Sequence, residues 1–507
     1  MMLLSPGAIA GVGLFSVVLL IVRCLSSPLR KLPGPAISAF TSLELKWNEL
    51  RANRTLYIHR LHLRYGPVVR IAPNEVSFTS WTALKDIYCS GGSGYDKTEF
   101  YDLFKIYGRR TMFTTLNKAD HAKRKRILAD RYANSNIMRG QALAGIQERS
   151  KRFILRCTGA GTQAHDIFVN TPPRVALHAY ACDCITHHLF HPRGTNCLED
   201  SADEKMMHQV AADDSLQNRL ISFYNPTFHR LISGILNIFA KPRETPLADN
   251  YVMQTSKHHD PTSFTLMSRL REKVGLLDEK MSVLGEKTAV LDETDAAAEC
   301  LDHMAAGIDT TGDALCFMMW ELSQPRSLEF QRRLQEELEE NRDAPLDQLP
   351  FLDAVVSEGL RCFPPIPMSL PRYVPAEGRT IDGIRLPGGT IVSCQAYSVQ
   401  RLNPEVYPEP QKFNPDRWLQ GEGDTERRRL LFAFSNGGRG CVGKHLALAE
   451  MKTLLRDVYS DYSTTPHISM TEEAMALSDQ LISSRPLGQK CLLHFHPLDG
   501  SDIKAEG

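Results

Sequence analysis

One segment of this chain is long enough, and free enough of proline, to form a helix across an entire domain. Residues 292–323 contain no proline and two glycines, and Gln324-Pro325 follows them. At 1.5 Å per residue, a helix of this length extends about 48 Å. Apolar side chains such as Leu301, Ile308 and Trp320 occupy most of its sides, so the helix should be buried. The segment therefore predicts a large helical domain arranged around one central helix.

The rest of the chain predicts more helix than strand. A second helix is expected from Pro350 to Cys362, because proline is tolerated in a first turn and Pro364-Pro365 ends the pattern. Residues 140–290 also read as helices, and the sequence does not give their order in space. Further helical patterns cover 43–63 and 444–459, strand patterns cover 68–71, 76–78, 380–386 and 390–394, and a terminal hairpin is expected from Leu481 and 491–495. The predicted fold is mainly α with a smaller β-rich part (α+β).

The N-terminus reads as a membrane anchor. No charged residue precedes Arg23, and a helix of 22 residues would be about 33 Å long, enough to cross a hydrocarbon core. The basic residues that follow place the rest of the chain in the cytosol by the positive-inside rule. A cleaved signal peptide is the alternative, but a basic n-region and a small-x-small site are both missing. We expect one transmembrane helix over 1–22, a basic, Pro/Gly-rich linker over 23–37, and one domain over 38–507.

Composition limits the classes of partner. Lys+Arg and Asp+Glu both number 59, so the formal net charge is zero and no global basic field exists to hold nucleic acid. Apolar residues make up 42% and charged residues 23%, an ordinary globular balance. These values exclude a disordered chain and a polytopic membrane protein, and we expect no nucleic-acid partner.

The clearest chemical signal is a glycine-rich loop around one cysteine. Residues 434–443 read FSNGGRGCVG, and an expected helix begins just after them. A cysteine at the start of a helix loses its proton more easily, and N–H groups of a tight loop can point at its sulfur. A zinc site would need three more ligands, and only His445 is close in sequence. A lone Cys441 thiolate suits haem iron, whose other ligands come from the porphyrin.

This loop resembles the cysteine-ligand loop of the cytochrome P-450 monooxygenases, Phe-x-x-Gly-x-Arg-x-Cys-x-Gly, at every fixed position. The resemblance implies the fold of that family and haem b with Cys441 as its axial thiolate ligand. It also implies cofactor-binding positions at Phe434, Arg439 and Gly443. Residues 65–74 look like the early strand pair of filamentous-fungal members that act in secondary metabolism.

Two further motifs agree with the resemblance. In EGLR over 358–361, Glu358 and Arg361 share one helix face. The resemblance implies that Arg417, from a Phe-x-Pro-x-Arg stretch, completes a buried ionic cluster with them. AGIDTT over 306–311 lies inside the long helix. There the resemblance implies a local bulge beside the iron and a proton relay formed by Asp309 and Thr310.

The basic residues around the expected cofactor are matched less well. The resemblance assigns contacts with the haem propionates to His121, to Arg372 and to Arg439. The family also has an arginine four residues after the position of His121. This chain has Lys125 there and Arg126 one position later, so the choice between them stays open. The basic positions 123–124 and 427–429 suit either a solvated surface or the docking of an acidic electron donor.

Taken as a whole, the resemblance implies oxidation, typically hydroxylation, of a hydrophobic small molecule such as a polyketide, terpenoid or alkaloid intermediate. The 66 residues after Cys441 are too few for a flavin domain. We therefore expect electrons from a separate NADPH-cytochrome P-450 reductase, with cytochrome b5 as a second candidate donor. The expected location is the endoplasmic reticulum membrane, with the catalytic domain in the cytosol. The resemblance draws the pocket from residues 95–104, 297–306, 366–370 and 481–484.

Two alternatives remain at the level of sequence. One is a haem-thiolate isomerase or dehydratase that needs no reductase, and such members often lose the acid–threonine pair that Asp309 and Thr310 match. The other is a non-catalytic haem-binding protein at the membrane, in which an intact oxygen-activation motif would have no purpose.

Overall fold

The computed structural model describes residues 11, 15, 18, 22, 26–158, 164–168, 177–211, 215–240, 242–258, 264–273 and 291–498. The predicted anchor over 1–22 lies almost entirely outside these residues. Among the residues that are described, no helix combines the length and the apolar character needed to cross a membrane.

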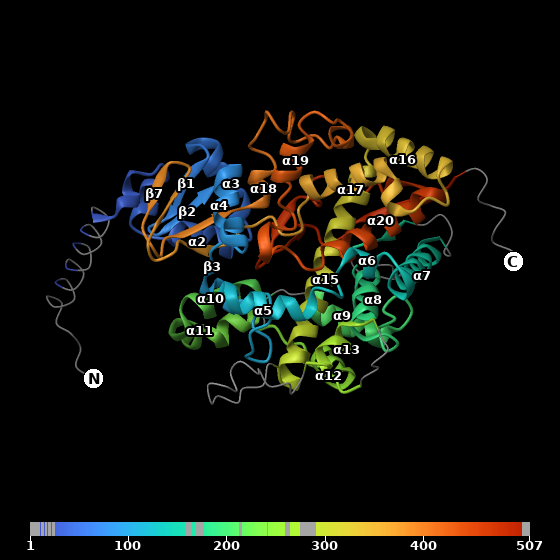
Figure 1. The fold of residues 1–507 in the computed structure, drawn as a ribbon, viewed down its shortest axis with the longest axis horizontal. Coiled ribbons are helices and arrows are strands. Elements are labelled where there is room, and N and C mark those ends of the chain that lie inside the picture. Colours follow the sequence, from blue (N-terminus) through green and yellow to red (C-terminus); the bar gives the residue numbers. More distant parts are fainter. Residues whose placement is uncertain are drawn as a thin grey trace.

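Helices form most of the molecule, and a smaller β-rich part lies at one side of it (Figure 1). The helices in chain order are α2 (Leu43–Leu50), α3 (Arg54–Tyr65), α4 (Trp81–Cys89), α5 (Lys118–Leu128), α6 (Asn134–Ile137), α7 (Gly140–Thr158), α8 (Leu177–Phe190), α9 (Ser201–Ala211), α10 (Leu216–Tyr224), α11 (Pro226–Phe239), α12 (Pro246–Thr255), α13 (Leu266–Arg271), α15 (Glu293–Leu322), α16 (Leu328–Glu340), α17 (Pro350–Cys362), α18 (Ala396–Val399), α19 (Asp424–Leu430) and α20 (Lys444–Asp461). The predicted mainly helical character is confirmed.

The long central helix is α15, and it begins and ends where its capping residues predict. Asp292 caps its N-terminus in a capping box with Asp295, and Ser323 follows its last residue. It runs through the middle of the molecule and packs against α8 and α20 (Figure 1). The expected bulge near residues 306–311 is wrong, because 293–322 is one uninterrupted α-helix. Gly307 instead permits close packing, since an added Cβ would lie 2.8 Å from Ile185.

The main sheet has the strand order β1-β2-β8-β5-β3. Its strands are β1 (Val68–Ala72), β2 (Glu75–Phe78), β3 (Asp96–Lys97), β5 (Arg372–Tyr373) and β8 (Ile391–Cys394). β2 pairs with β8 in parallel, and the other pairs are antiparallel. The pairing of β3 with β5 sets Lys97 directly opposite Arg372. Two cations from distant parts of the sequence therefore meet at one edge of the sheet.

Three smaller sheets complete the β structure of the part of the chain that is described. They are the hairpin β6 (Arg379–Ile381) with β7 (Ile384–Leu386), the pair β10 (Leu477–Asp479) with β11 (Ser484–Pro486), and the sheet β4 (His165–Asp166), β12 (Leu492–Pro497) and β9 (Tyr462–Pro466). The predicted terminal hairpin is wrong. Leu481 lies in the turn between β10 and β11, whereas β12 pairs with β4 and β9. The predicted helix over 43–63 is also divided in two, at Ala52 with its φ of 53°.

Arg70 of β1 ties the segment before the first helices onto this sheet. Its guanidinium donates to the carbonyl oxygens of Leu29 (3.2 Å), Arg30 (3.0 Å) and Pro35 (3.1 Å). Gly34 passes so close that an added Cβ would lie 2.3 Å from the carbonyl oxygen of Arg70. The last part of the predicted linker is therefore folded against the domain.

Substitution Arg70→Met should release this segment. The lost charge-assisted hydrogen bonds should lower the free energy of unfolding by about 3 kcal/mol, and trypsin should cleave after Arg30 and Lys31 faster. Urea unfolding and timed proteolysis measure both effects. Arg64→Met, on the exposed side of α3, is the control and should leave both unchanged. Equal cleavage rates in the two variants would contradict the role of Arg70.

Candidate active site

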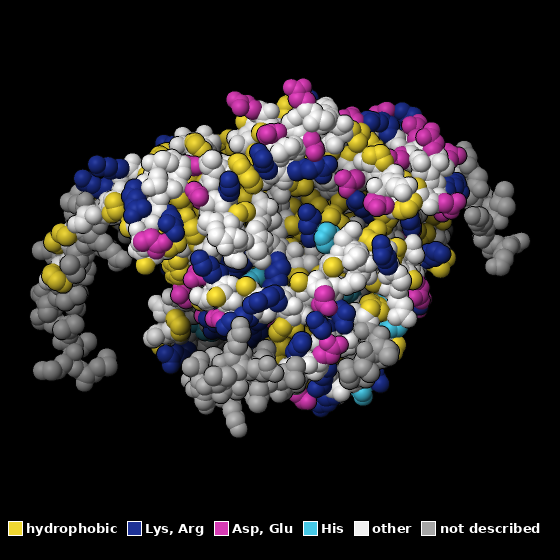
Figure 2. Space-filling model, viewed as in Figure 1, with side chains coloured by type: hydrophobic (Ala, Val, Ile, Leu, Met, Phe, Trp, Pro, Cys, Tyr) yellow, Lys and Arg dark blue, Asp and Glu magenta, His cyan; other side chains and the backbone are white. Residues whose placement is uncertain are grey.

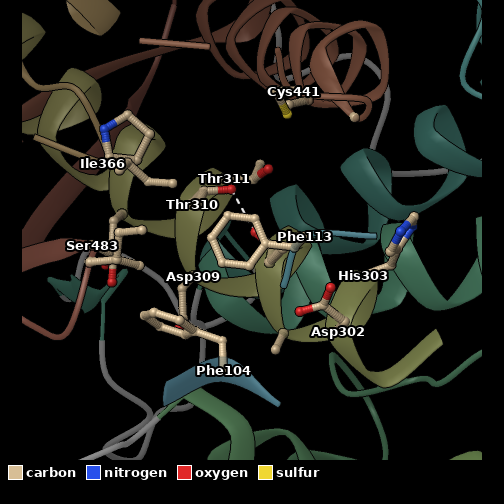
Figure 3. A pocket seen from close by; sticks show the side chains of 18 of the residues that line it. Phe104, Phe113, Asp302, His303, Asp309, Thr310, Thr311, Ile366, Cys441 and Ser483 are labelled. Carbon is tan, nitrogen blue, oxygen red and sulfur yellow. Dashed lines mark hydrogen bonds between the residues drawn. The ribbon is translucent and has the colours of Figure 1, made fainter. Parts of the chain in front are cut away.

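A cavity of about 410 Å³ lies between α15, the loop before α20 and the turn joining β10 to β11. Figure 3 shows Cys441 on one side, with Thr310 and Thr311 of α15 facing it across the cavity. The predicted pocket segments reach this cavity only in part. The side chains they contribute are Lys97, Tyr101, Phe104, Asp302, His303, Ala305, Ala306, Ile366, Leu370, Leu481, Ile482 and Ser483.

The loop over 434–443 holds the cysteine between backbone donors and a helix N-terminus. The N–H of Cys441 donates to the carbonyl oxygen of Phe434 (2.9 Å), and α20 begins at Lys444 as the sequence predicts. Burial raises the pKa of the Cys441 thiol, whereas the N–H of Gly443 and the charge of Lys125 lower it. Among the described cysteines, Cys441 is the one that lines the cavity.

Asp309 and Thr310 also line the cavity, on the side of α15. The Thr310 hydroxyl donates to the carbonyl oxygen of Ala306 (2.6 Å), within its own helix. An acid and a hydroxyl thus stand on adjacent residues of a buried helix, opposite a cysteine sulfur. This arrangement can pass a proton to a small molecule held between α15 and Cys441.

Basic side chains gather at another wall of the cavity, where Lys97, His121, Arg372 and Arg439 are all buried. Burial and then the charges of Arg372 and Arg439 hold the pKa of Lys97 well below its usual range. Burial and then Arg439 and Lys97 lower the pKa of His121 to about 2. Like charges that lie directly opposite each other on a sheet repel. A bound anion would offset this repulsion, so this wall of the cavity suits a negatively charged group.

The hydrogen bonds of this wall leave capacity for such an anion. The Nη1 atoms of Arg372 and Arg439 donate to the same carbonyl oxygen, that of Tyr95, at 3.3 and 3.4 Å. The Nε atoms of both arginines are buried without a hydrogen-bond partner. The Lys97 ammonium donates to the carbonyl oxygen of Phe113. Lys97 lies within the predicted pocket segment 95–104, but sequence reasoning did not assign it to this basic wall. No motif surrounds it, and only the β3–β5 pairing sets it opposite Arg372.

Lys125 and Arg126 lie in different places. The Lys125 ammonium donates to the carbonyl oxygens of Gly438 (2.9 Å) and Gly440 (3.1 Å), so it holds the cysteine loop from the side. Arg126 is exposed and donates within its own helix. Neither residue lines the cavity. Arg124, taken as a surface residue in the sequence, turns inward to the buried Glu299 (3.4 Å).

The predicted ionic cluster is assembled around one fully buried carboxylate, that of Glu358. It accepts hydrogen bonds from Arg361 Nε (2.8 Å), Arg417 Nε (3.0 Å), the Trp418 indole (2.9 Å) and the Asn414 N–H (2.9 Å). Burial alone would raise the pKa of Glu358, but Arg361 and Arg417 hold it below its usual value. The carboxylate is therefore ionised at neutral pH.

A second residue that sequence reasoning missed connects this cluster to the cysteine loop. Arg361 donates to the carbonyl oxygen of Gln400 (3.2 Å), and the side chain of Gln400 donates back to the carbonyl oxygen of Arg361 (2.8 Å). The same side chain accepts the N–H of Phe432 (2.8 Å), two residues before the loop begins. The position of Cys441 is thus fixed from α17 through Gln400.

Substitution Glu358→Gln should destabilise the protein strongly. The amide keeps the shape of the side chain but leaves the charges of Arg361 and Arg417 buried without a counter-ion, at a cost of about 3–5 kcal/mol. Urea unfolding at pH 7 measures the loss. Because the pKa of Glu358 is depressed, its stabilisation is present above about pH 4.5 and disappears as the pH falls further. The gap between wild type and variant should narrow below that value, and a gap independent of pH would contradict this account.

Curated proteins similar to this chain are fungal monooxygenases. The cytochrome P450 monooxygenase stcB of Emericella nidulans is 27% identical over 92% of this chain and 88% of its own. The cytochrome P450 monooxygenase tazI of Aspergillus terreus is 29% identical over 93% and 95%. The benzoate 4-monooxygenase bphA of Aspergillus niger is 25% identical over 96% and 97%. A family model described as Cytochrome P450 matches residues 33–492, and the chain therefore belongs to the cytochrome P450 family, as a haem-thiolate monooxygenase.

Proposed function

We propose that this enzyme inserts one oxygen atom of O2 into a hydrophobic small molecule, an intermediate of fungal secondary metabolism. The observation that carries the proposal is the position of Cys441 across the cavity from Asp309 and Thr310 (Figure 3). Hydroxylation is the outcome we expect, with a polyketide, terpenoid or alkaloid as substrate. Near full-length similarity to fungal monooxygenases supports the class of reaction, and the class of substrate rests on the resemblance described in the sequence analysis.

The residues of the cavity fit haem. Arg372, Arg439, Lys97 and His121 supply an anion-binding wall for its two carboxylates, and the unpartnered Nε atoms of both arginines support this assignment. Cys441 supplies the thiolate ligand. When bound, the haem activates dioxygen, and a thiolate ligand favours cleavage of the O–O bond. Lys125 has a different role in this proposal: it holds the cysteine loop and favours the ionised sulfur.

Asp309 and Thr310 are proposed to move protons toward a dioxygen molecule held in the cavity. Asp309 holds the proton. The Thr310 hydroxyl donates to the carbonyl oxygen of Ala306, and it can exchange this hydrogen bond for one to an oxygen atom in the cavity. Phe104, Phe113 and Ile366 line the remaining space and exclude water from it (Figure 3). An isomerase or dehydratase would have no use for such a proton relay, so the monooxygenase is favoured.

Electrons are proposed to come from a separate NADPH-dependent reductase, with cytochrome b5 as a second candidate. Figure 2 shows Lys and Arg side chains gathered over α5, which carries the exposed Lys118, Lys123 and Arg126. α5 also carries Lys125, which contacts the cysteine loop, so an acidic partner bound there would approach the haem from the thiolate side. Arg427 does not belong to this surface, because it is buried and donates to the carbonyl oxygen of Glu422 (2.7 Å).

Attachment to the endoplasmic reticulum membrane remains part of the proposal, with the domain facing the cytosol. Apolar side chains support it. α11 buries no residue, and its Leu231 and Phe239 are 80% and 84% exposed. α2, which packs on α10, exposes Leu43 and Trp47. Apolar groups exposed side by side suit contact with lipid.

Substitution Cys441→Ser should abolish the haem-thiolate spectrum. The reduced, carbon monoxide-bound wild type should show the red-shifted Soret band of a thiolate ligand, and the variant should lose both this band and NADPH-dependent oxygen consumption. Cys157→Ser, at a buried cysteine of α7 outside the cavity, is the control and should retain the band. A retained band in Cys441→Ser would overturn the assignment of the ligand.

Substitution Lys97→Met should loosen the haem rather than unfold the protein. The variant loses one cation of the anion-binding wall, and we expect haem transfer to apomyoglobin to become about tenfold faster, as for one lost charge-assisted hydrogen bond. Lys85→Met, at an exposed position of α4 outside the cavity, is the control. Equal transfer rates in wild type and Lys97→Met would remove Lys97 from the haem site.

A further inference from the structure

A buried histidine–carboxylate pair lies along the cavity beyond the acid–threonine motif. His178, near the start of α8, faces Asp313 of α15, with 3.2 Å between His178 Nε2 and Asp313 Oδ1. Both residues are buried and both line the cavity. The mechanism proposed above uses neither of them.

The hydrogen bonds of His178 require a proton to be shared within this pair. His178 Nδ1 lies 3.2 Å from the carbonyl oxygen of Phe168, which can only accept, so Nδ1 carries a hydrogen. Nε2 faces the carboxylate of Asp313, so one further proton must sit on either His178 or Asp313 to make that contact a hydrogen bond. The pair is therefore either imidazolium with carboxylate or imidazole with carboxylic acid, and both forms hold one proton between Nε2 and Oδ1.

The surrounding structure is shaped to hold this imidazole. Gly312 lies against its ring, and an added Cβ there would stand 2.8 Å from His178 Cδ2. The ring of Phe168 meets it edge-on, with 5.0 Å between the ring centroids. The imidazole is thus fixed between α8 and α15 by a glycine and an aromatic ring.

The pair is close enough to Asp309 for their charges to interact. Asp309 and Asp313 are four residues apart on one helix and share a face that lines the cavity. The hydrogen bond and charge of Asp313, and then the charge of Asp309, raise the pKa of His178 although its burial acts in the opposite direction. Arg485 of β11 also faces the pair, and its charge opposes the rise that burial causes in the pKa of Asp313.

We propose that His178 and Asp313 form a proton-holding pair that reloads Asp309 during turnover. The inference rests on the proton-donating role proposed for Asp309. Each monooxygenase turnover converts RH, O2, NADPH and one H⁺ into ROH, H2O and NADP⁺. One proton of the water product passes through Asp309, and a proton from the pair then replaces it. The pair is left as neutral imidazole and carboxylate until a proton from solvent outside the substrate space returns to it, and no electron passes through it.

The test uses full-length holoenzyme with purified NADPH-cytochrome P-450 reductase and no added substrate. The electrons of NADPH then reduce O2 to hydrogen peroxide or, where proton delivery is efficient, to water. We expect Asp313→Asn to raise the share recovered as peroxide about three- to tenfold at pH 8, which is less than the roughly 10²–10⁴-fold that general acid catalysis contributes, because Asp309 itself is retained. His178→Gln, whose amide can still donate to Asp313 but carries no exchangeable charge, should act in the same direction.

A second readout does not depend on activity. Because its pKa is raised, protonated His178 stabilises the folded wild type below about pH 6.5, and this stabilisation is lost as the pH rises through the raised pKa. In Asp313→Asn the carboxylate is missing, and the imidazole of His178 stays neutral. The stability of this variant therefore does not fall as the pH rises through the pKa that His178 has in wild type. The difference in Tm between wild type and Asp313→Asn should therefore shrink from pH 6 to pH 9.

The matched control is His187→Asn. His187 is also a buried imidazole of α8 packed against a glycine, Gly145, and it contacts one backbone carbonyl, that of Gln141, at 3.1 Å. Burial lowers the pKa of His187 to about 4, so wild type gains stability as the pH rises through about 6.5, where this histidine titrates in the unfolded chain. The Tm difference between wild type and His187→Asn should therefore not shrink from pH 6 to pH 9, unlike that of Asp313→Asn, and the peroxide share should stay unchanged.

The outcomes separate the two proposals. If Asp309→Asn and Asp313→Asn both raise the peroxide share and the Tm difference shrinks with pH, the pair is supported. If Asp309→Asn raises the share while Asp313→Asn and His178→Gln match wild type, or the Tm difference is constant, the pair is overturned and the role of Asp309 stands. If Asp309→Asn has no effect, both are overturned.

Discussion

The buried carboxylate of Glu358 is the interaction on which the geometry of the active site depends. No solvent reaches it, so its ionisation requires the two arginines and the indole that surround it. The same contacts bring α17 and the segment around Arg417 together, and Gln400 extends them to the backbone just before the cysteine loop. A rigid polar cluster thus positions one end of a loop whose other end begins α20. Between these fixed ends, the loop presents Cys441 to the cavity.

The sequence predicts the elements whose ends are marked by local chemistry. α15 starts at a capping box, and α17 starts at Pro350 and ends before Pro364-Pro365, so both were predictable to within a residue. The prediction failed where distant pairing decides the structure. The helical pattern over 43–63 continues across Ala52, but the chain turns there with positive φ. The last strand alternates as a hairpin would, yet its partners β4 and β9 lie elsewhere in the chain.

The residues of the active site also divide into those that local sequence predicts and those that depend on distant contacts. The cysteine loop, the acid–threonine pair and the Glu358 cluster are dense local motifs, and the structure brings the residues of each together. Lys97, Gln400 and the His178–Asp313 pair carry no motif, because each acquires its place from a contact between segments far apart in sequence. Lys125 shows an intermediate case. Its spacing indicated the cofactor region, but the choice between a carboxylate and the loop carbonyls depends on how α5 packs.

The charged side chains around the cavity are arranged so that an anionic group and a proton can be held at different places in it. Basic side chains from β3, β5 and the cysteine loop form one wall, and Asp309 and Asp313 of α15 with His178 form another. The basic wall repels itself while empty of anions, so binding a dianion there relieves strain that folding imposed. The acidic side instead retains a proton inside a low-dielectric interior, where an unpaired carboxylate would be costly. Because the two sets of side chains come from different elements, the haem proposed here can be anchored by one set while the proposed proton supply comes from the other.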